Sequence, residues 1–287
     1  MTPAEGGKII RAALDLGVNM VDTAHLYGTF PHVREGLRGY TGEVMVASKT
    51  HAGDAATARE HVEEALREMN LERLDVLLLH GGRVAEPFTE RAEVLEELCR
   101  MKEEGIARTI GISSHFISVI RDAAAVPEID VIHPLINRTG MGILDGNAEE
   151  MAQAIALASS AGKGVYAMKA LAGGNLISSA RESISWVMDL EGVHALAMGM
   201  MSEAEIEANV ELVSSGNAPD EVWEQLEKGR RSLTIMRNFC TGCGACIEVC
   251  KDGALSMVEG AAMVDSSLCV LCGYCGAACP DFIIRVT

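Results

Sequence analysis

The sequence predicts an α/β fold, in which a (β/α)8-type barrel is followed by a small α+β domain that holds metal clusters. Apolar, β-rich runs alternate with amphipathic helical stretches over most of the chain. Eight of the nine cysteines lie between Cys240 and Cys279. The length of 287 residues suits one barrel and one small domain.

Seven runs rich in apolar residues predict parallel strands, because strands covered by helices on both faces carry no polar face. They are Val18–Ala24, Val44–Ser48, Leu74–Leu79, Thr109–Ser113, Val131–Ile136, Val165–Ala170 and His194–Met198. Segments of helical period separate them, such as Thr57–Met69 and Thr89–Glu103, and a helix over Gly7–Leu16 precedes the first run. Since a closed barrel needs eight strands, we expect either a barrel that lacks its first strand or a chain that starts too late.

The barrel pattern ends in a polar break. After the last strand, Ser214–Asp220 is polar, and a helix follows from Glu221 to about Arg231. We place the domain boundary near Leu233, which gives a barrel over residues 1–233 and a cluster domain over residues 234–287.

Charge and hydropathy exclude several classes of protein. The net charge is 24 − 41 = −17, so the chain lacks the basic surface that nucleic acid or an anionic membrane requires. Charged residues interrupt Met1–Gly17, so we read no signal peptide there. No apolar run reaches the roughly 18 residues of a membrane span, and free thiolates require a reducing compartment. We expect a soluble cytoplasmic protein, of unknown oligomeric state.

The cysteines form two copies of one motif, Cys-x-x-Cys-x-x-Cys-x-x-x-Cys. In such a motif three thiolates wrap one cubane cluster and the fourth reaches toward the other copy. This predicts two ligand sets for 4Fe-4S clusters: Cys240, Cys243, Cys246 and Cys279 for the first, and Cys269, Cys272, Cys275 and Cys250 for the second. The pattern resembles a bacterial-type two-cluster ferredoxin domain, although Lys251 stands where the second copy has Pro280. Two zinc sites are the alternative.

Ionisable residues follow three successive strands, where the chemistry of a barrel is found. Asp22 and Tyr27 follow the first run, Lys49 the second and His80 the third. Taken singly, each has a structural explanation, as a helix cap, rim packing or a surface charge. Together they resemble the catalytic tetrad of the aldo-keto reductase superfamily. The resemblance spans about residues 7–214.

The resemblance implies a role for each of the four side chains. Tyr27 would donate a proton to a carbonyl, with its pKa lowered toward neutrality by Lys49, and Asp22 would keep Lys49 charged and placed. His80 would orient the carbonyl. Family membership also implies a small carbonyl or alcohol substrate and a hydride from NAD(H) or NADP(H).

The nicotinamide positions depart from the family pattern. A Ser-Asn pair, a Gln and a stacking aromatic residue are replaced by Ser113 and Ser114, His133 and Ile136. Gly173 and Gly174 follow the sixth run of this chain and offer a turn for a pyrophosphate. At the adenosine end, the candidates are Gly199, Glu205 and Asn209. A carboxylate there repels the 2′-phosphate of NADP, which favours NAD.

Two readings of function follow. The first is an iron-sulfur oxidoreductase that reduces a carbonyl or oxidises an alcohol. The alternative is a ferredoxin-type electron-transfer protein, in which the clusters feed the barrel directly or the barrel is a docking scaffold. Because hydride transfer moves two electrons and a cubane moves one, a flavin between them stays open, as does an electron-transfer partner protein. His25, His51 and His115 also lie near strand ends, without the spacing of a second metal site.

Overall fold

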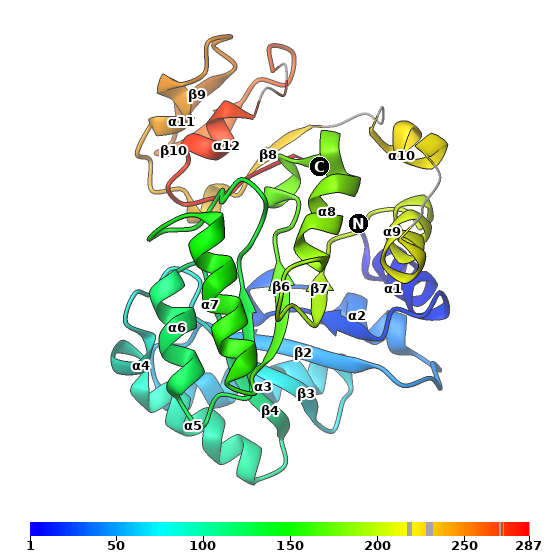
Figure 1. Ribbon diagram of the computed structural model, residues 1–287, viewed down its shortest axis with the longest axis vertical. Coiled ribbons are helices and arrows are strands. Elements are labelled where there is room, and N and C mark those ends of the chain that lie inside the picture. Colours follow the sequence, from blue (N-terminus) through cyan, green and yellow to red (C-terminus); the bar gives the residue numbers. More distant parts are fainter. Residues whose placement is uncertain (217–219, 228–231, 270, 272, 287) are drawn as a thin grey trace.

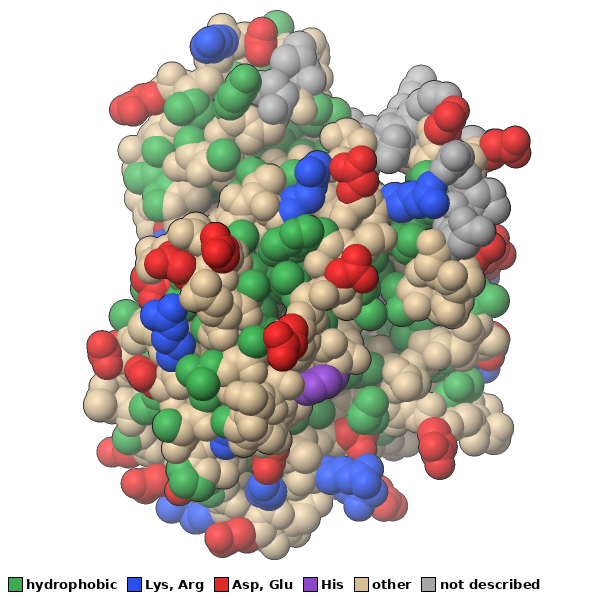
Figure 2. All heavy atoms as spheres, in the orientation of Figure 1, with side chains coloured by type: hydrophobic (Ala, Val, Ile, Leu, Met, Phe, Trp, Pro, Cys, Tyr) green, Lys and Arg blue, Asp and Glu red, His purple; other side chains and the backbone are tan. Residues whose placement is uncertain are grey.

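The computed structural model describes the chain except for residues 217–219, 228–231, 270, 272 and 287. Figure 1 shows a sheet surrounded by helices, with a smaller domain at one end. Acidic side chains are spread over the face seen in Figure 2 rather than gathered in one patch. No helix in the described residues is long and apolar enough to cross a membrane.

The barrel is a parallel sheet of seven strands in sequence order. The strands are β1 (Met20–Asp22), β2 (Met45–Thr50), β3 (Leu74–His80), β4 (Ala107–Ser114), β5 (Val131–Pro134), β6 (Gly164–Met168) and β7 (Ala195–Ala197). Each coincides with one of the apolar runs, so the predicted fold class is confirmed. The described ladders run from β1 to β7, and none of them joins β7 back to β1.

Helices cover the outside of the sheet. They are α1 (Pro3–Asp15), α2 (Phe30–Leu37), α3 (Ala55–Met69), α4 (Pro87–Glu90), α5 (Ala92–Glu103), α6 (Ile117–Ala125), α7 (Ala148–Ser160), α8 (Ala180–Met188), α9 (Glu203–Ser215) and α10 (Asp220–Glu227). Side-chain caps start several of them: Thr2 forms a capping box with Glu5, and Asp54 accepts a hydrogen bond from the Thr57 amide. The single helix expected over Thr89–Glu103 is instead split at Arg91, whose φ of −127° is not helical. Residues 228–231 of the last expected helix lie outside the described residues.

The core has two layers. The larger layer packs the helices onto the outer face of the sheet, through residues such as Val62, Leu98 and Ile120. A smaller cluster fills the inside of the barrel and includes Leu78 and Tyr166. The barrel is therefore a packed body, and chemistry is confined to its ends.

The small domain is built from short elements. They are β8 (Leu233–Ile235), α11 (Ala245–Glu248), β9 (Leu255–Val258), β10 (Ala261–Val264), α12 (Tyr274–Ala278) and β11 (Ile284–Val286). β9 pairs with β10 and β8 pairs with β11, both antiparallel. Gly244 and Gly273 precede the two short helices with φ of 79° and 82°, a conformation that glycine adopts without steric cost.

The last strand holds the small domain against the barrel. Phe282 is 2% exposed and packs against Leu135, Met168 and Ala172 of the barrel. A Cβ at Gly174, in the loop after β6, would lie closer than 3.0 Å to the carbonyl oxygen of Val286. The end of the barrel that holds the C-terminal ends of its strands is thus partly covered by β11.

Candidate functional site

The first three strands bring the predicted tetrad together at this covered end. Asp22, Lys49 and His80 lie at or next to the C-terminal ends of β1, β2 and β3. Tyr27 lies on a short 3-10 turn, His25–Tyr27, that follows β1. Parallel strands end at the same edge of a sheet, so residues distant in sequence converge there.

A buried ion pair is the centre of the site. The Lys49 side chain is 1% exposed, and its Nζ donates to Asp22 Oδ2 at 2.5 Å and to the Thr23 carbonyl oxygen at 2.9 Å. Tyr166 Oη donates to Asp22 Oδ1 at 3.0 Å from the other side of the barrel. Both carboxylate oxygens are therefore fixed, and the ammonium group has one defined position.

Tyr27 and His80 complete the group. Lys49 Nζ lies 5.1 Å from the centroid of the Tyr27 ring, and the Tyr27 and His80 rings meet edge to face at 5.9 Å. Tyr27 is 48% exposed, so its ring is accessible at the mouth of the barrel. A carbonyl group can approach the phenol and the imidazole together.

The protonation states suit a proton donor. Burial of the mouth and the Asp22 carboxylate raise the pKa of Tyr27 above its usual value of 10. This direction is the reverse of the one expected from the Lys49 charge alone. Burial also lowers the pKa of Lys49, and burial together with Lys49 lowers the pKa of His80 to about 3. At neutral pH the phenol keeps its proton and His80 is uncharged.

The cysteines of the small domain form two groups. Burial raises the pKa of the Cys246 thiol, and Cys279, Cys243 and Cys240 contribute in the same direction, so these four lie close together. The amide of Ala262 donates to Cys240 Sγ at 3.4 Å. The first group thus contains Cys279, which belongs to the second motif in the sequence.

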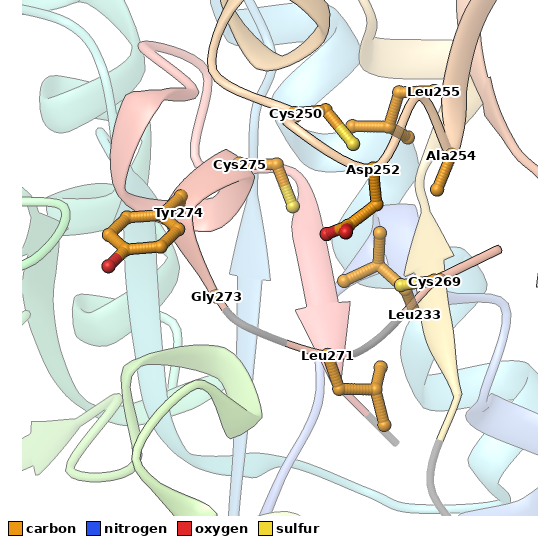
Figure 3. A pocket seen from close by; sticks show the side chains of 10 residues that line it. All are labelled: Leu233, Cys250, Asp252, Ala254, Leu255, Cys269, Leu271, Gly273, Tyr274 and Cys275. Atoms are coloured by element: carbon orange, nitrogen blue, oxygen red, sulfur yellow. The ribbon is translucent and has the colours of Figure 1, made fainter.

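The second group surrounds a small cavity. Cys250, Cys269 and Cys275 line it, together with Asp252, and Figure 3 shows these side chains around one common space. Three thiols facing one space fit the chemistry of an iron-sulfur cluster. Cys272 lies outside the described residues.

Comparison with known proteins identifies both parts. Residues 1–182 match the model of the aldo/keto reductase family, and residues 224–283 match that of the 4Fe-4S dicluster domain. The first match covers more than half of the chain. The chain belongs to the aldo/keto reductase family.

Curated relatives of this aldo/keto reductase match part of its length. The aldo-keto reductase YhdN of Bacillus subtilis is 31% identical over 144 residues, which cover 45% of this chain and 42% of YhdN. The pyridoxine 4-dehydrogenase of Escherichia coli is 31% identical over 142 residues, 42% of this chain and 48% of that enzyme. The chain thus matches less than half the length of these curated relatives.

Solved structures show the same fold. The holo form of the aldo-keto reductase AKR11C1 from Bacillus halodurans has a TM-score of 0.61 at 24% identity, covering 79% of this chain and 87% of that one. The Bombyx mori aldo-keto reductase AKR2E4, solved in complex with NADP, has a TM-score of 0.61 at 16% identity, covering 79% and 83%.

The nicotinamide end of this aldo/keto reductase offers one open polar group. Ser113 is fully buried, and its Oγ has no hydrogen-bond partner among the described residues, so it fits a carboxamide. Ser114 Oγ already accepts from the Phe116 amide at 3.0 Å. His133 has its Nδ1 2.6 Å from the Tyr166 carbonyl oxygen and stacks on the Tyr166 ring at 3.9 Å. Ile136 is fully buried.

The pyrophosphate end does not fit a dinucleotide. A Cβ at Gly173 would lie 2.9 Å from the Arg285 side chain, and Gly174 faces the backbone of Val286. The turn that the sequence assigns to a pyrophosphate is therefore covered by β11. A dinucleotide laid along the mouth requires this strand to move.

The adenosine positions lie around the start of α9. Gly199 is exposed, with no atom within 4 Å of a Cβ built on it, and Asn209 is half-buried. Glu205 does not present a free carboxylate, because its Oε2 accepts from the Met201 amide at 2.6 Å. A ribose hydroxyl that donates to this oxygen would therefore compete with the local hydrogen bond.

Three histidines stack beside the tetrad. One nitrogen of each of His25, His51 and His61 lies within 4.8 Å of the others. The His25 and His61 rings are nearly parallel, with centroids 3.6 Å apart. A metal ion binds in the plane of an imidazole, so one ion cannot lie in both planes, and the arrangement is that of a ring stack. The sequence did not point to His61, which lies within α3.

The sequence also missed two cations at the mouth. Lys169 follows β6, within the run expected to be a strand, and Arg285 comes from β11. The position of Lys169 at a strand end is the same signal that identified Lys49. Arg285 carries no such signal, because only the docking of the small domain brings it to the barrel.

Proposed function

We propose that this aldo/keto reductase reduces a carbonyl group to an alcohol at the mouth of its barrel, with Tyr27 as the proton donor. The observation that carries this is the fixed position of Lys49 between Asp22 Oδ2, at 2.5 Å, and the Tyr27 ring, at 5.1 Å. A buried ammonium beside a phenol stabilises the phenolate that is left after proton transfer. His80, neutral at pH 7, donates a hydrogen bond from its N–H to the substrate carbonyl oxygen.

The direction of the reaction follows from the proton on Tyr27. Alcohol oxidation needs the phenolate as a base, whereas carbonyl reduction needs the phenol as an acid. The raised pKa of Tyr27 favours the phenol. Reduction adds two electrons and two protons to the C=O group: Tyr27 supplies the proton that goes to the oxygen, and water supplies the proton that goes to the carbon.

We propose further that the electrons come from the small domain. When bound, two 4Fe-4S clusters supply one electron each, which balances one carbonyl reduction. The covering of the Gly173-Gly174 turn by β11 favours this route over a bound dinucleotide. The cysteine groups described above are the proposed ligand sets, and residues 1–233 and 234–287 the proposed domains.

The test uses the full chain with clusters reconstituted anaerobically. Clusters are photoreduced, a neutral carbonyl such as methylglyoxal is added without nicotinamide, and reoxidation is followed by visible absorption. We expect Tyr27→Phe to slow reoxidation by about 10²- to 10⁴-fold, the usual contribution of a positioned acid. Tyr40→Phe is the matched control, because Tyr40 contacts the backbone of Leu14 instead of the tetrad.

Two results would contradict the proposal. If Tyr27→Phe and Tyr40→Phe reoxidise at the same rate, the tetrad takes no part and the barrel is a docking scaffold. If reoxidation needs NADH, or if NADH alone reduces the carbonyl, the electrons do not pass directly from the small domain.

A further inference from the structure

Lys169 and Arg285 lie at the mouth of the barrel, and neither forms an ion pair with a carboxylate among the described residues. Lys169 has a φ of 68°, a left-handed conformation that costs about 1–2 kcal/mol for a residue with a Cβ. Strained backbone of this kind is retained mainly at functional sites. Arg285 is half-buried beside Gly173, and neither cation has a carboxylate within ion-pair distance among the described residues.

The hydrogen bonds of Arg285 go to backbone oxygens and not to a carboxylate. Its Nη1 donates to the Phe282 carbonyl oxygen at 2.5 Å and to that of Ile284 at 3.3 Å. The guanidinium carbon lies 4.9 Å from the centroid of the Phe282 ring. These contacts fix the side chain through one nitrogen and leave the other donors of the planar group for a ligand.

The charges around Lys169 sum to an excess of positive charge. The charged groups that act on it are Arg285, Lys49 and Asp22. Asp22 is already bonded to Lys49, and the opposite charge nearest to act on Arg285 is that of Cys279, a proposed cluster ligand, so no free carboxylate compensates the two cations. Burial and Arg285 lower the pKa of Lys169 to about 8, which still leaves it mostly protonated at pH 7. Cations removed from water require a compensating anion.

We propose that Lys169 and Arg285 bind the carboxylate of a small oxo acid whose carbonyl group is presented to Tyr27 and His80. This inference rests on the proposed carbonyl reduction and names its substrate class. A guanidinium binds a carboxylate through two parallel hydrogen bonds, and an ammonium adds a point charge beside it. Arg285 lies against Gly173, in the loop after β6, which places the anion subsite at the same end of the barrel as the proton donor.

A substrate carboxylate fits this position better than a phosphate of a dinucleotide. The backbone of Val286 closes on Gly174, so no extended ligand can follow the turn. Phe282 is buried against Leu135 and Ala172, so the mouth is closed on that side too.

The buried polar atoms nearby support a ligand at this place. His115 is acted on by Lys169, Arg83 and Arg285, and its buried Nδ1 has no hydrogen-bond partner among the described residues. The buried Nδ1 of His80 lacks a partner in the same way. A buried polar atom without a partner costs about 1–3 kcal/mol, which a bound ligand offsets.

Equilibrium dialysis on the reconstituted full chain tests the inference. The probes are pyruvate, its uncharged ester methyl pyruvate, inorganic phosphate and pyrophosphate. We expect pyruvate to bind at least about tenfold more tightly than methyl pyruvate, since one charge-assisted hydrogen bond is worth about 1.5–3 kcal/mol. Arg285→Gln and Lys169→Gln should each remove this preference, and Arg285→Lys should restore part of it.

Controls separate binding from chemistry and from folding. Arg138→Gln is the matched control, because Arg138 bonds Ser179 and Ser183 near α8. Tyr27→Phe should keep the pyruvate preference while carbonyl reduction is lost, so failure of the proposed reduction is distinguished from failure of the subsite. The cluster absorbance of each variant reports whether the small domain is intact.

Three outcomes would overturn the inference. The first is equal affinity for pyruvate and methyl pyruvate. The second is an unchanged preference in Arg285→Gln and Lys169→Gln with clusters intact. The third is pyrophosphate binding that depends on Arg285 and is tighter than pyruvate binding, which would assign the subsite to a dinucleotide.

Discussion

Replacing Gly174 by alanine should release β11 from the barrel. Gly174 has a φ of 92°, and an added Cβ would clash with the Val286 carbonyl oxygen. Gly17 is a matched control: its φ is 96° and a Cβ there meets no atom within 4 Å. Both substitutions should lower stability by about 1–2 kcal/mol, because alanine disfavours a positive φ. Gly174→Ala alone adds the cost of overpacking, about 1–3 kcal/mol.

Hydrogen exchange measures this difference in stability at β11 itself. Peptides over residues 280–286 should exchange about 5- to 150-fold faster in Gly174→Ala than in Gly17→Ala, because about 1.4 kcal/mol corresponds to a factor of ten. The measurement uses cluster-loaded protein, so that the small domain keeps its fold. Equal exchange in the two variants would refute the conclusion that β11 is seated on the Gly174 turn.

Three further predictions concern the buried groups. Asp22→Asn should cost about 3–5 kcal/mol of unfolding free energy, because Lys49 is left buried without a counter-ion, and adding Lys49→Met should recover part of this cost. The pKa values of His80 and His115 are about 3 in the folded chain against 6.5 unfolded. The unfolded chain therefore binds more protons below pH 6.5, and each histidine should lower stability by about 1.4 kcal/mol per pH unit as the pH falls from 6.5 toward 3. Cys279→Ser should halve the iron content from about eight atoms to about four.

Urea unfolding followed by the fluorescence of Trp186 and Trp223 checks the first two predictions, since both tryptophans lie in the barrel. A cost below about 1 kcal/mol for Asp22→Asn would show that the ion pair is solvated. His115→Asn should reduce the pH slope, and an unchanged slope would contradict the burial argument. Iron and sulfide assays check the third prediction, with Cys99→Ser as the control.

The strands could be predicted from the sequence because helices cover their outer faces and the barrel core fills the inner ones. Leu74–Leu79 is apolar except for Asp75, and β3 includes all of it. The break at Arg91 was not predictable, because the periodicity of the apolar residues continues through it. Which residues pair at the edges depends on tertiary contacts that no local pattern contains.

The convergence of these side chains could also be predicted, since Asp22, Lys49 and His80 lie at or next to the C-terminal ends of their strands. The rise in the pKa of Tyr27 could not be predicted from the sequence. A motif shows which charges lie nearby, but it does not show how deeply a side chain is buried. Lys169 lies within a segment that was expected to be a strand. The strand ends instead at Met168, because Lys169 has a left-handed φ. Arg285 reaches the site only through contacts between two domains, which sequence spacing does not encode.

Because β11 packs against the barrel, the complete site depends on the supply of iron. β11 begins at Ile284, shortly after Cys279 in the chain, and a small domain built around clusters depends on them for its fold. In a cell short of iron, the barrel would fold with Tyr27 in place but without Arg285 at its mouth. The supply of iron would then determine the fraction of molecules in which Arg285 lies at the mouth of the barrel, without a separate regulator.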